Sequence, residues 1–440
     1  MKLLLVGGGG REHALAWRIR RERPDAVLLA APGNPGIATL GATCLPIRAD
    51  DVPALVTLAA TEKVDLVVVG PEAPLALGLV DACRQRGIAA FGPTAAAAQL
   101  ETSKAFSKAL MHDAGVPTAR ATMHRDVAGA LAAVHTLGAP VVVKASGLAA
   151  GKGVVVAATV AEAEAAVRDM LEGSAFGDAG SEVLVEEYMT GEELSLFVLT
   201  DGTTALPLPA AQDHKRIGEG DTGPNTGGMG AYCPADAGDP AFTPRADGTT
   251  APGIAQVLDT IVAPTLAAMR DRGIPFTGLL YCGLMLTPAG PKVVEFNCRF
   301  GDPETQAVLV ALGDDASVVD AMLAIGRGEP LPPARFAATR ASVATVVAAA
   351  GYPASARSGD AMTLPADTAD TVVFHAGTAR RDDGTLVTAG GRVVAVTAAG
   401  DTLRAAQRAS QAAAAAVDFA GAQFRRDIGW RALARDAGAS

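Results

Sequence analysis

The sequence lacks the features that mark secreted, zinc-stabilised and membrane-spanning proteins. Its five cysteines are scattered through 440 residues without a Cys-x-x-Cys pair, so we expect neither a disulfide framework nor a cysteine zinc site, and the free thiols indicate a reducing compartment. No apolar run approaches the roughly 18 residues that cross a bilayer, and residues 1–6 are too few for the core of a signal peptide. These absences predict a cytoplasmic protein that contacts no membrane.

Positive charge is scarce as well. The formal net charge is −10 at pH 7, and only eight of the 37 basic residues are lysines. A chain with this charge does not hold nucleic acid by bulk electrostatics, so the expected partners are small molecules. Because lysine is rare, each lysine that falls in a motif is informative about function.

What is present is a folded, multidomain chain. Apolar residues make up 49% of the sequence and charged residues 19%, which is a globular composition, and at about 150 residues per domain the length predicts about three domains. Short apolar runs at 3–6, 27–30, 66–69 and 88–91 alternate with helical or turn segments, as in a parallel sheet. The stretch 95–114 lacks glycine and proline and predicts one long helix. We place the first domain, α/β with a parallel sheet, at 1–102.

The remaining chain predicts two further domains. A middle domain at 103–327 contains a subdomain at about 123–190 that forms a flexible flap, and a smaller α+β domain covers 328–440. In the middle domain we expect strands at 141–144, 154–157 and 183–187, helices at 161–172 and 253–272, a loop at 212–232, and a hairpin of 278–286 with 292–297. In the last domain we expect strands at 343–348, 372–375 and 393–397 and a final helix at 401–419.

Four glycines follow the first strand and open a helix, which is a context that binds phosphate through backbone amides. The dinucleotide fingerprint is incomplete, because Glu12 stands at its last position and the second strand ends in 30–34 without the acid that binds a ribose. Three interpretations stay open: a site for one phosphate group, glycines that serve only the geometry of the turn, and, least favoured, dinucleotide binding.

A second glycine-rich segment, 146–153, contains Lys152 and follows Lys144 at the end of a strand. It is not a Walker A loop, since Ser146 replaces the first glycine, Gly153 replaces the magnesium-binding hydroxyl residue, and a strand rather than a helix follows. The pattern favours a flap that closes over a triphosphate. A lysine that merely reaches solvent at the strand rim is the alternative for Lys144.

Two strands carry carboxylates. The strand 183–187 ends in Glu186 and Glu187 and is followed by Glu193. In this arrangement the backbone after the strand could bind adenine, and a carboxylate could bind the ribose. Acidic residues of a solvent-exposed turn, without a ligand, are the alternative. On 293–299, alternation sends Glu295, Asn297 and Arg299 to one face. Glutamate and asparagine oxygens are hard ligands that suit magnesium, and Arg299 would stabilise anionic charge beside it; a surface salt bridge is the alternative.

Together these motifs resemble the ATP-grasp superfamily, and within it the phosphoribosylamine-glycine ligase family. The resemblance extends over essentially the whole chain, and RFGDPETQ is its most specific motif. The segments that carry it are GGREHA (9–14), GPEAP (70–74), GLAAGKG (147–153), QDHKR (212–216), TGPNTGGMGAY (222–232), RFGDPETQ (299–306) and RRDIGW (425–430).

The resemblance implies that the enzyme joins glycine to 5-phospho-β-D-ribosylamine and converts ATP to ADP and phosphate, with Mg²⁺ or Mn²⁺. We also expect glycyl phosphate as the intermediate and a monomeric enzyme. Positioning and charge neutralisation then dominate the site, since no classical nucleophile is needed. The implied ATP contacts are Lys104, Lys144, Gly147, Gly151, Lys152, Gly153, Glu186, Glu187, Met189 and Glu193. The implied substrate contacts are Gly9, Gly10, Asn34, Glu72, Asp213 and His214, the metal ligands are Glu295 and Asn297, and the catalytic residues are Arg299 and Lys215.

The sequence departs from the family pattern at four positions, with Gly8, Ser146, Ala211 and Cys233 where Asn or Ser, Asp, Ser and Ser are expected. The change at Ser146 removes a carboxylate beside the flap, and none of the four lies on the proposed metal strand. Three alternative functions stay open: another ATP-grasp enzyme such as a biotin-dependent carboxylase subunit or a formate-using purine enzyme, a nicotinamide-dependent oxidoreductase, and a catalytically silent nucleotide sensor.

Overall fold

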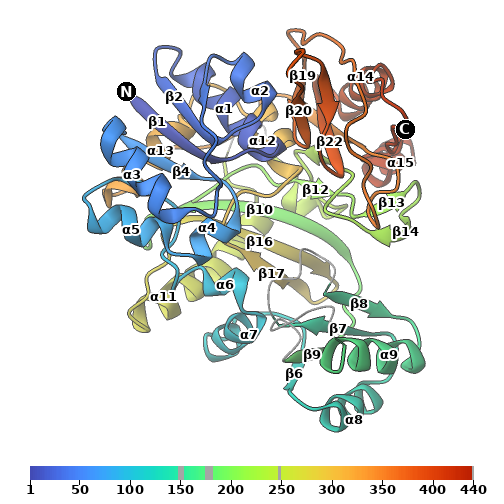
Figure 1. Ribbon diagram of the computed structural model, residues 1–440. Helices are drawn as coiled ribbons and strands as arrows, with labels where there is room; N and C mark the ends of the chain where they lie inside the picture. Colours follow the sequence, from blue (N-terminus) through green and yellow to red (C-terminus); the bar gives the residue numbers. More distant parts are fainter. Residues whose placement is uncertain (147–152, 174–181, 246–248, 439–440) are drawn as a thin grey trace.

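The N-terminal part of the chain is a parallel sheet, as predicted. The computed structural model describes residues 1–146, 153–173, 182–245 and 249–438. The sheet has five strands in the order β3-β2-β1-β4-β5 (Figure 1). Its strands are β1 (Lys2–Gly7), β2 (Val27–Pro32), β3 (Thr43–Cys44), β4 (Leu66–Val69) and β5 (Ala90–Phe91), and its helices are α1 (Gly10–Glu22), α2 (Pro35–Thr39), α3 (Val52–Glu62), α4 (Glu72–Ala76) and α5 (Leu79–Gln85). The strand order reverses between β1 and β4, so the segments that follow these strands flank the position where such sheets bind ligands.

The predicted helix at 95–114 is wrong in one respect, because the structure breaks it into α6 (Gln99–Thr102) and α7 (Lys104–Asp113). Ser103 lies between them with extended backbone (φ −131°, ψ 104°), and its hydroxyl accepts a hydrogen bond from the Phe106 amide. Serine is a strong helix N-cap because it satisfies an amide that otherwise lacks a partner. The break places Lys104 at the start of α7.

The middle region contains two antiparallel sheets. The first has the order β6-β9-β7-β8 and its own hydrophobic core, and α8 and α9 pack on it (Figure 1). Its elements are β6 (Ala121–His124), α8 (Val127–Leu137), β7 (Val141–Ala145), β8 (Val154–Ala157), α9 (Val160–Leu171) and β9 (Val183–Glu187). The second has the order β11-β10-β16-β17 and consists of β10 (Glu192–Thr200), β11 (Ala205–Pro207), β16 (Gly278–Thr287) and β17 (Gly290–Asn297). The predicted hairpin is thus confirmed as β16 and β17.

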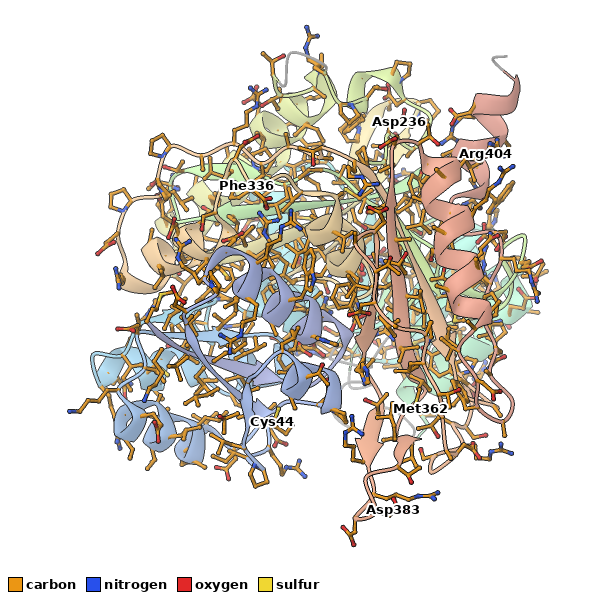
Figure 2. All side chains as sticks on the ribbon, turned by 90° about the horizontal axis from the view of Figure 1, so that it is seen from above. Cys44, Asp236, Phe336, Met362, Asp383 and Arg404 are labelled. Atoms are coloured by element: carbon orange, nitrogen blue, oxygen red, sulfur yellow. The ribbon has the colours of Figure 1, made fainter. Side chains whose placement is uncertain are left out.

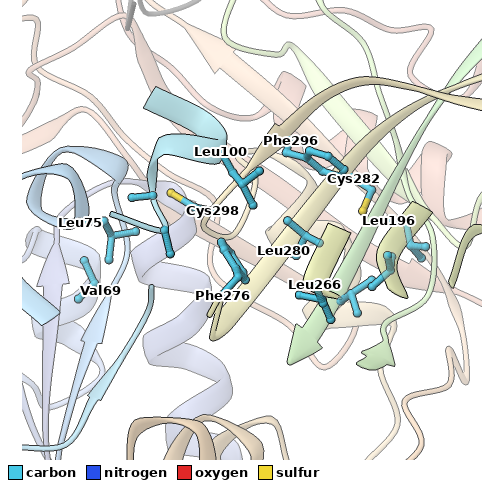
Figure 3. Packing of buried hydrophobic residues seen from close by; sticks show 14 of the residues in the cluster. Val69, Leu75, Leu100, Leu196, Leu266, Phe276, Leu280, Cys282, Phe296 and Cys298 are labelled. Atoms are coloured by element: carbon cyan, nitrogen blue, oxygen red, sulfur yellow. The ribbon is translucent and has the colours of Figure 1, made fainter. Parts of the chain in front are cut away.

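The helix predicted at 253–272 is confirmed as one continuous run with a π-helical turn in the middle. It consists of α10 (Pro252–Val257), η3 (Leu258–Val262) and α11 (Ala263–Asp271). By length and composition alone this run is apolar enough to cross a membrane. Its side chains Val257, Ile261 and Leu266 instead belong to the main hydrophobic core. That core is continuous from Val69 in the parallel sheet to Leu196 in the second antiparallel sheet (Figure 3).

The predicted loop at 212–232 is wrong, because it contains four short strands. Two of them join the C-terminal sheet, whose order is β12-β15-β18-β22-β19, and α14 packs on β18 and β22 of this sheet (Figure 2). The loop strands are β12 (Gln212–Asp213), β13 (Arg216–Gly218), β14 (Thr222–Asn225) and β15 (Gly230–Cys233). The other elements are η2 (Pro240–Phe242), α12 (Glu304–Ala311), α13 (Val318–Arg327), β18 (Ala341–Ala348), β19 (Thr371–His375), β20 (Thr378–Arg380), β21 (Leu386–Thr388), β22 (Arg392–Gly400), α14 (Leu403–Ala415) and α15 (Trp430–Gly438). The expected final helix, α14, is therefore followed by another.

A buried histidine pair joins the parallel-sheet region to the C-terminal sheet. His13 on α1 accepts a hydrogen bond at Nδ1 from the His375 backbone amide at 2.8 Å, and the two rings lie 5.6 Å apart. Burial lowers the pKa of His13 to about 3, with a smaller contribution from His375, and burial lowers the pKa of His375 to about 4. Both rings are therefore neutral at pH 7.

This pair predicts a loss of stability in mild acid. The unfolded chain protonates each histidine near pH 6.5 and the folded chain does not, so stability is fully present above pH 6.5 and falls as the pH decreases toward 4. Between pH 7 and pH 5 we expect about 2 kcal/mol of lost stability for each histidine. Urea unfolding of His13→Gln should show a weaker pH dependence than that of His112→Gln, which changes an exposed ring; equal pH dependences would contradict the prediction.

Candidate active site

Two lysines and a glutamate are buried together where the two antiparallel sheets meet. Lys144, near the end of β7, lies 2.7 Å from Glu186 on β9, and Lys108 on α7 lies 3.2 Å from the same carboxylate. The Lys144 ammonium also approaches the carbonyl oxygen of Val294 on β17 at 3.4 Å. Lys144 is only 7% exposed, which rules out the alternative of a solvated rim lysine. Glu186 holds the Lys144 side chain facing β17.

Lys104 joins this group because α7 begins at that residue. Burial is the main cause that lowers the pKa of Lys104, and Glu295, Lys144 and Glu186 all lie close enough to affect it. The backbone amide of Lys104 donates to the carbonyl oxygen of Ser146 at 3.0 Å. The helix break at Ser103 therefore brings a third lysine to the same place.

The proposed metal strand exposes Glu295 and buries Asn297, whose side-chain oxygen accepts a hydrogen bond from Arg299 at 3.4 Å, and its alternation is not regular. The pairing of β17 with β16 shifts register next to Gly283, so Val293 is buried while Val294 is half-buried. Glu295 is exposed, and Asn297 is 9% exposed. In the part of the chain that the structure describes, the Glu295 oxygens make no hydrogen bond or ion pair.

Four cations surround Glu295. Desolvation alone would raise the pKa of Glu295, but the charges of Lys215, Lys144, Lys104 and Arg299 outweigh it and hold the pKa below its usual range. The carboxylate is therefore ionised at neutral pH. One carboxylate and one amide oxygen fit Mg²⁺, which takes one or two protein oxygens and completes its octahedron with phosphate oxygens and water. The cations provide charge for a polyphosphate at the same position.

Arg299 is held by two carboxylates, of which the sequence interpretation named only one. Its guanidinium lies 3.1 Å from Glu72, which follows β4, and 3.0 Å from Glu101 on α6. Glu101 also accepts a hydrogen bond from the Cys298 amide at 2.8 Å. Glu101 was missed because its position within an expected helix gave no motif. Burial would raise the pKa of Glu72, but Arg299 and Arg11 lower it.

The QDHKR segment sends its side chains to opposite faces. Lys215 forms an ion pair with Glu193. Desolvation would lower the pKa of Lys215, but Glu193, Asp213 and Glu295 raise it well above its usual value. Burial raises the pKa of Asp213 to about 7; Lys215 opposes this rise, and Glu304, Glu193 and Glu295 add to it.

The structure does not bring His214 to this group. The His214 ring is 2% exposed, and its Nε2 accepts a hydrogen bond from the Gly429 amide at 3.0 Å. Burial, reinforced by the charge of Arg425, lowers the pKa of His214 to about 4. The alternation that turns Asp213 and Lys215 toward Glu295 turns His214 toward the C-terminal segment, so its expected contact with substrate stays a prediction.

Two carboxylates lie beside the expected phosphate site at Gly9 and Gly10. The Gly9 amide donates to Glu12 at 2.6 Å, and a Cβ at Gly9 or Gly10 would lie 3.7 Å from an oxygen of Asp302. Burial would raise the pKa of Asp302, but Arg392, Arg11 and hydrogen bonds lower it. Because the Gly9 amide is already bonded to Glu12, turn geometry gains support as the reason for these glycines, and the phosphate site stays a prediction.

Asn34, also expected at the substrate, is used structurally. Its side-chain amide donates to the carbonyl oxygens of Gly8 and His375, each at 2.9 Å, and its oxygen accepts from the Ile37 amide at 2.9 Å. These bonds use both amide hydrogens. Asn34 therefore fixes the segment after β1 rather than presenting a free group to a ligand.

The segment that was expected to read adenine connects the two antiparallel sheets. Desolvation would raise the pKa of Glu187, but hydrogen bonds from Arg120 and Lys292 lower it to about 2. Tyr188 is 44% exposed and Met189 half-buried, and neither belongs to a strand. Gly147, Gly151 and Lys152 lie outside the described residues, whereas the carbonyl oxygen of Gly153 accepts a hydrogen bond from the Ala145 amide at 2.8 Å.

Two antiparallel sheets, with a buried lysine on one and a Glu-x-Asn pair on the other, define an ATP-grasp enzyme. The chain matches three parts of one family: the phosphoribosylglycinamide synthetase N domain over residues 1–101, its ATP-grasp (A) domain over 102–305 and its C domain over 342–431. The chain therefore belongs to the phosphoribosylglycinamide synthetase family.

Relatives match over full length. The chain is 50% identical to a phosphoribosylamine–glycine ligase of Xanthomonas campestris pv. campestris, covering 99% of each chain, and 49% identical to one of Pseudomonas aeruginosa, covering 100% of each. A phosphoribosylamine–glycine ligase of Thermotoga maritima has a similar structure, with a TM-score of 0.83, 31% identity, and coverage of 97% of this chain and 100% of that one. A biotin carboxylase of Campylobacter jejuni, 15% identical with a TM-score of 0.71 and coverage of 97% and 93%, shares the fold alone.

Proposed function

We propose that this enzyme joins glycine to 5-phospho-β-D-ribosylamine in de novo purine synthesis and converts ATP to ADP and phosphate. The observation that carries the proposal is the convergence of Lys104, Lys144, Lys215 and Arg299 around the accessible carboxylate of Glu295. Four cations beside one metal-type carboxylate suit a transferring γ-phosphoryl group, whose charge must be neutralised in place. The full-length relatives that carry this name support the choice of substrates.

The reaction has two steps. A glycine carboxylate oxygen attacks the γ-phosphorus, and the bond from that phosphorus to the bridging oxygen breaks, so that ADP leaves with the electron pair. The ribosylamine nitrogen then attacks the carbonyl carbon of glycyl phosphate, phosphate departs, and the nitrogen loses a proton. Asp213, with its pKa near 7, suits acceptance of that proton at neutral pH.

The site residues take the following roles. Glu295 and Asn297 would hold Mg²⁺ or Mn²⁺, which supplies charge neutralisation on the phosphates when bound. Lys144, oriented by Glu186, and Lys104 bind the phosphates together with the 147–153 flap. The backbone from Glu186 to Met189 binds adenine, and Glu193 binds the ribose. Arg299 and Lys215 stabilise the transferring group, and Glu72 faces the sugar.

The remaining expectations concern the whole protein. We place domain boundaries near residues 102 and 327, and we propose a cytoplasmic monomer. Support for a monomer comes from the group around Glu295, because one chain supplies its cations from α7, β7 and the QDHKR segment.

A coupled assay of ADP release tests the function directly. ADP should appear only when glycine, freshly generated phosphoribosylamine, ATP and Mg²⁺ are all present, and omission of any one should reduce the rate to background. Bicarbonate with biotin, or formate, should not replace glycine. Release of ADP that depends on bicarbonate or formate and not on glycine would overturn the proposal in favour of another ATP-grasp enzyme.

A further inference from the structure

The C-terminal domain inserts an arginine between two segments of the middle domain. Arg392, the first residue of β22, donates through Nη1 to the carbonyl oxygen of Gly227 at 2.5 Å and to that of Asp302 at 2.6 Å. Its Nη2 lies 3.5 Å from the Asp302 carboxylate. The side chain is 23% exposed, so part of the guanidinium remains accessible while its position is fixed.

A second residue of the C-terminal domain secures the same loop. The Tyr352 hydroxyl accepts a hydrogen bond from the Gly227 amide at 2.9 Å, while Arg392 binds the Gly227 carbonyl oxygen. A Cβ at Gly227 would lie 3.2 Å from the Arg392 guanidinium carbon. Because both backbone groups of Gly227 are engaged, the position of Arg392 is set before any ligand arrives, which reduces the entropy lost on binding.

The phosphate of a sugar phosphate needs a cation in this region, since the Gly9 amide at the start of α1 is already bonded to Glu12. Three arginines of this part of the molecule each lie beside a carboxylate. Arg11 lies 2.6 Å from Glu12, and Arg299 lies 3.0 Å from Glu101. Each of those two is paired at hydrogen-bond distance, whereas the carboxylate beside Arg392 is 3.5 Å away. Among these three, Arg392 has the greatest capacity to bind another anion.

Arg392 also lies at one end of a connected series of charged groups. It contacts Asp302, whose pKa is affected by Arg11, and the charge of Arg11 in turn affects Glu72, which pairs with Arg299. The other end, at Arg299, is beside the Glu295 site. If the phosphate of a sugar phosphate binds at Arg392, its sugar can extend toward the Glu295 site, where the phosphoryl group is transferred. The carboxylates between the two positions can accept hydrogen bonds from the sugar hydroxyls.

We propose that Arg392 binds the 5-phosphate of the ribosylamine substrate, through Nε and Nη2, and that the C-terminal domain thereby contributes to the substrate site. This inference rests on the function proposed above. In the part of the chain that the structure describes, Nε donates to no protein acceptor and Nη2 makes only the longer contact with Asp302. Guanidinium groups bind phosphate oxygens with two parallel hydrogen bonds, so both nitrogens would be used.

The test compares Arg392→Gln with Arg408→Gln, which changes an exposed arginine on α14 of the same domain. Ribose 5-phosphate and ribose serve as stable competitors of phosphoribosylamine. In the unchanged enzyme, ribose 5-phosphate should inhibit at least tenfold more strongly than ribose. Arg392→Gln should raise KM for phosphoribosylamine at least tenfold, leave KM for ATP and glycine within about twofold, and remove the preference for ribose 5-phosphate. Arg408→Gln should change none of these values.

The outcomes separate this inference from the function on which it rests. If the unchanged enzyme shows no ADP release dependent on phosphoribosylamine and glycine, the proposed function fails. If it turns over normally and Arg392→Gln still prefers ribose 5-phosphate, or loses affinity for ribose and ribose 5-phosphate equally, the assignment of Arg392 is overturned. Should Arg392→Gln fail to fold, Arg392→Lys keeps a charge and should keep the preference for ribose 5-phosphate with a raised KM; loss of that preference would also overturn the assignment.

Discussion

Glu295→Gln is expected to lower kcat for ligation at least a thousandfold while the protein remains folded. The substitution removes the only carboxylate of the proposed metal pair and leaves Lys215, Lys144 and Lys104 without the anion that they surround. A divalent cation that loses a carboxylate ligand loses much of its affinity, and without it the phosphoryl charge is not neutralised. The side chain is exposed, so we expect the free energy of unfolding to change by less than about 1 kcal/mol.

Steady-state kinetics over a range of Mg²⁺ concentrations, together with thermal unfolding, measure this effect. Glu62→Gln is a matched control, because Glu62 is a half-buried surface glutamate that pairs with Lys2 at 2.9 Å, far from the Glu295 group. The control should keep full activity. Full activity in Glu295→Gln at low Mg²⁺ would show that the metal is bound elsewhere.

Lys215→Met is expected to lower kcat about a hundredfold to a thousandfold, the range for loss of one preorganised charge at a reacting group. Lys215 is paired with Glu193 and lies close to Asp213 and Glu295. Removing it leaves three carboxylates near one another without their cation. Since Lys215 holds the pKa of Asp213 down, the pKa of Asp213 should rise above 7, and the remaining activity should require higher pH.

The pH profile of kcat distinguishes this explanation from a general loss of structure. Lys2→Met, which changes a surface lysine paired with Glu62, should leave both kcat and the profile unchanged. A profile of Lys215→Met that moves to lower pH, or an unchanged kcat, would contradict the charge arrangement described here.

Much of the architecture follows from local patterns in the sequence. The apolar runs that alternate with helical segments predicted the parallel sheet, and the strands 141–144, 154–157 and 183–187 appear as β7, β8 and β9. The paired runs near 278–297 predicted the β16–β17 hairpin. These elements were predictable because their residues have the composition and spacing that a single strand or helix requires on its own.

The errors have a common cause. Nothing in the spacing around Ser103 indicated that its hydroxyl would cap a new helix, and the glycine-rich stretch 212–232 was assigned to a loop although β12 and β15 pair within the C-terminal sheet. Each of these structures depends on contacts with residues far away in the sequence, and the spacing of apolar residues within one segment gives no information about such contacts. Short strands rich in glycine are stable only when such partners are present.

The sequence by itself determined the class of chemistry. The rare lysines and the Glu295–Asn297 pair indicated phosphate and metal chemistry, because phosphate transfer requires cations and metal ligands that few other residues can replace. The resemblance carried by the RFGDPETQ motif pointed to the ligase family. Only the tertiary structure decided how the groups are used. It paired Lys144 with Glu186 and Arg299 with Glu101, turned His214 away, and placed two carboxylates beside the α1 start. Burial and long-range pairing set these arrangements, and both arise only when distant segments meet.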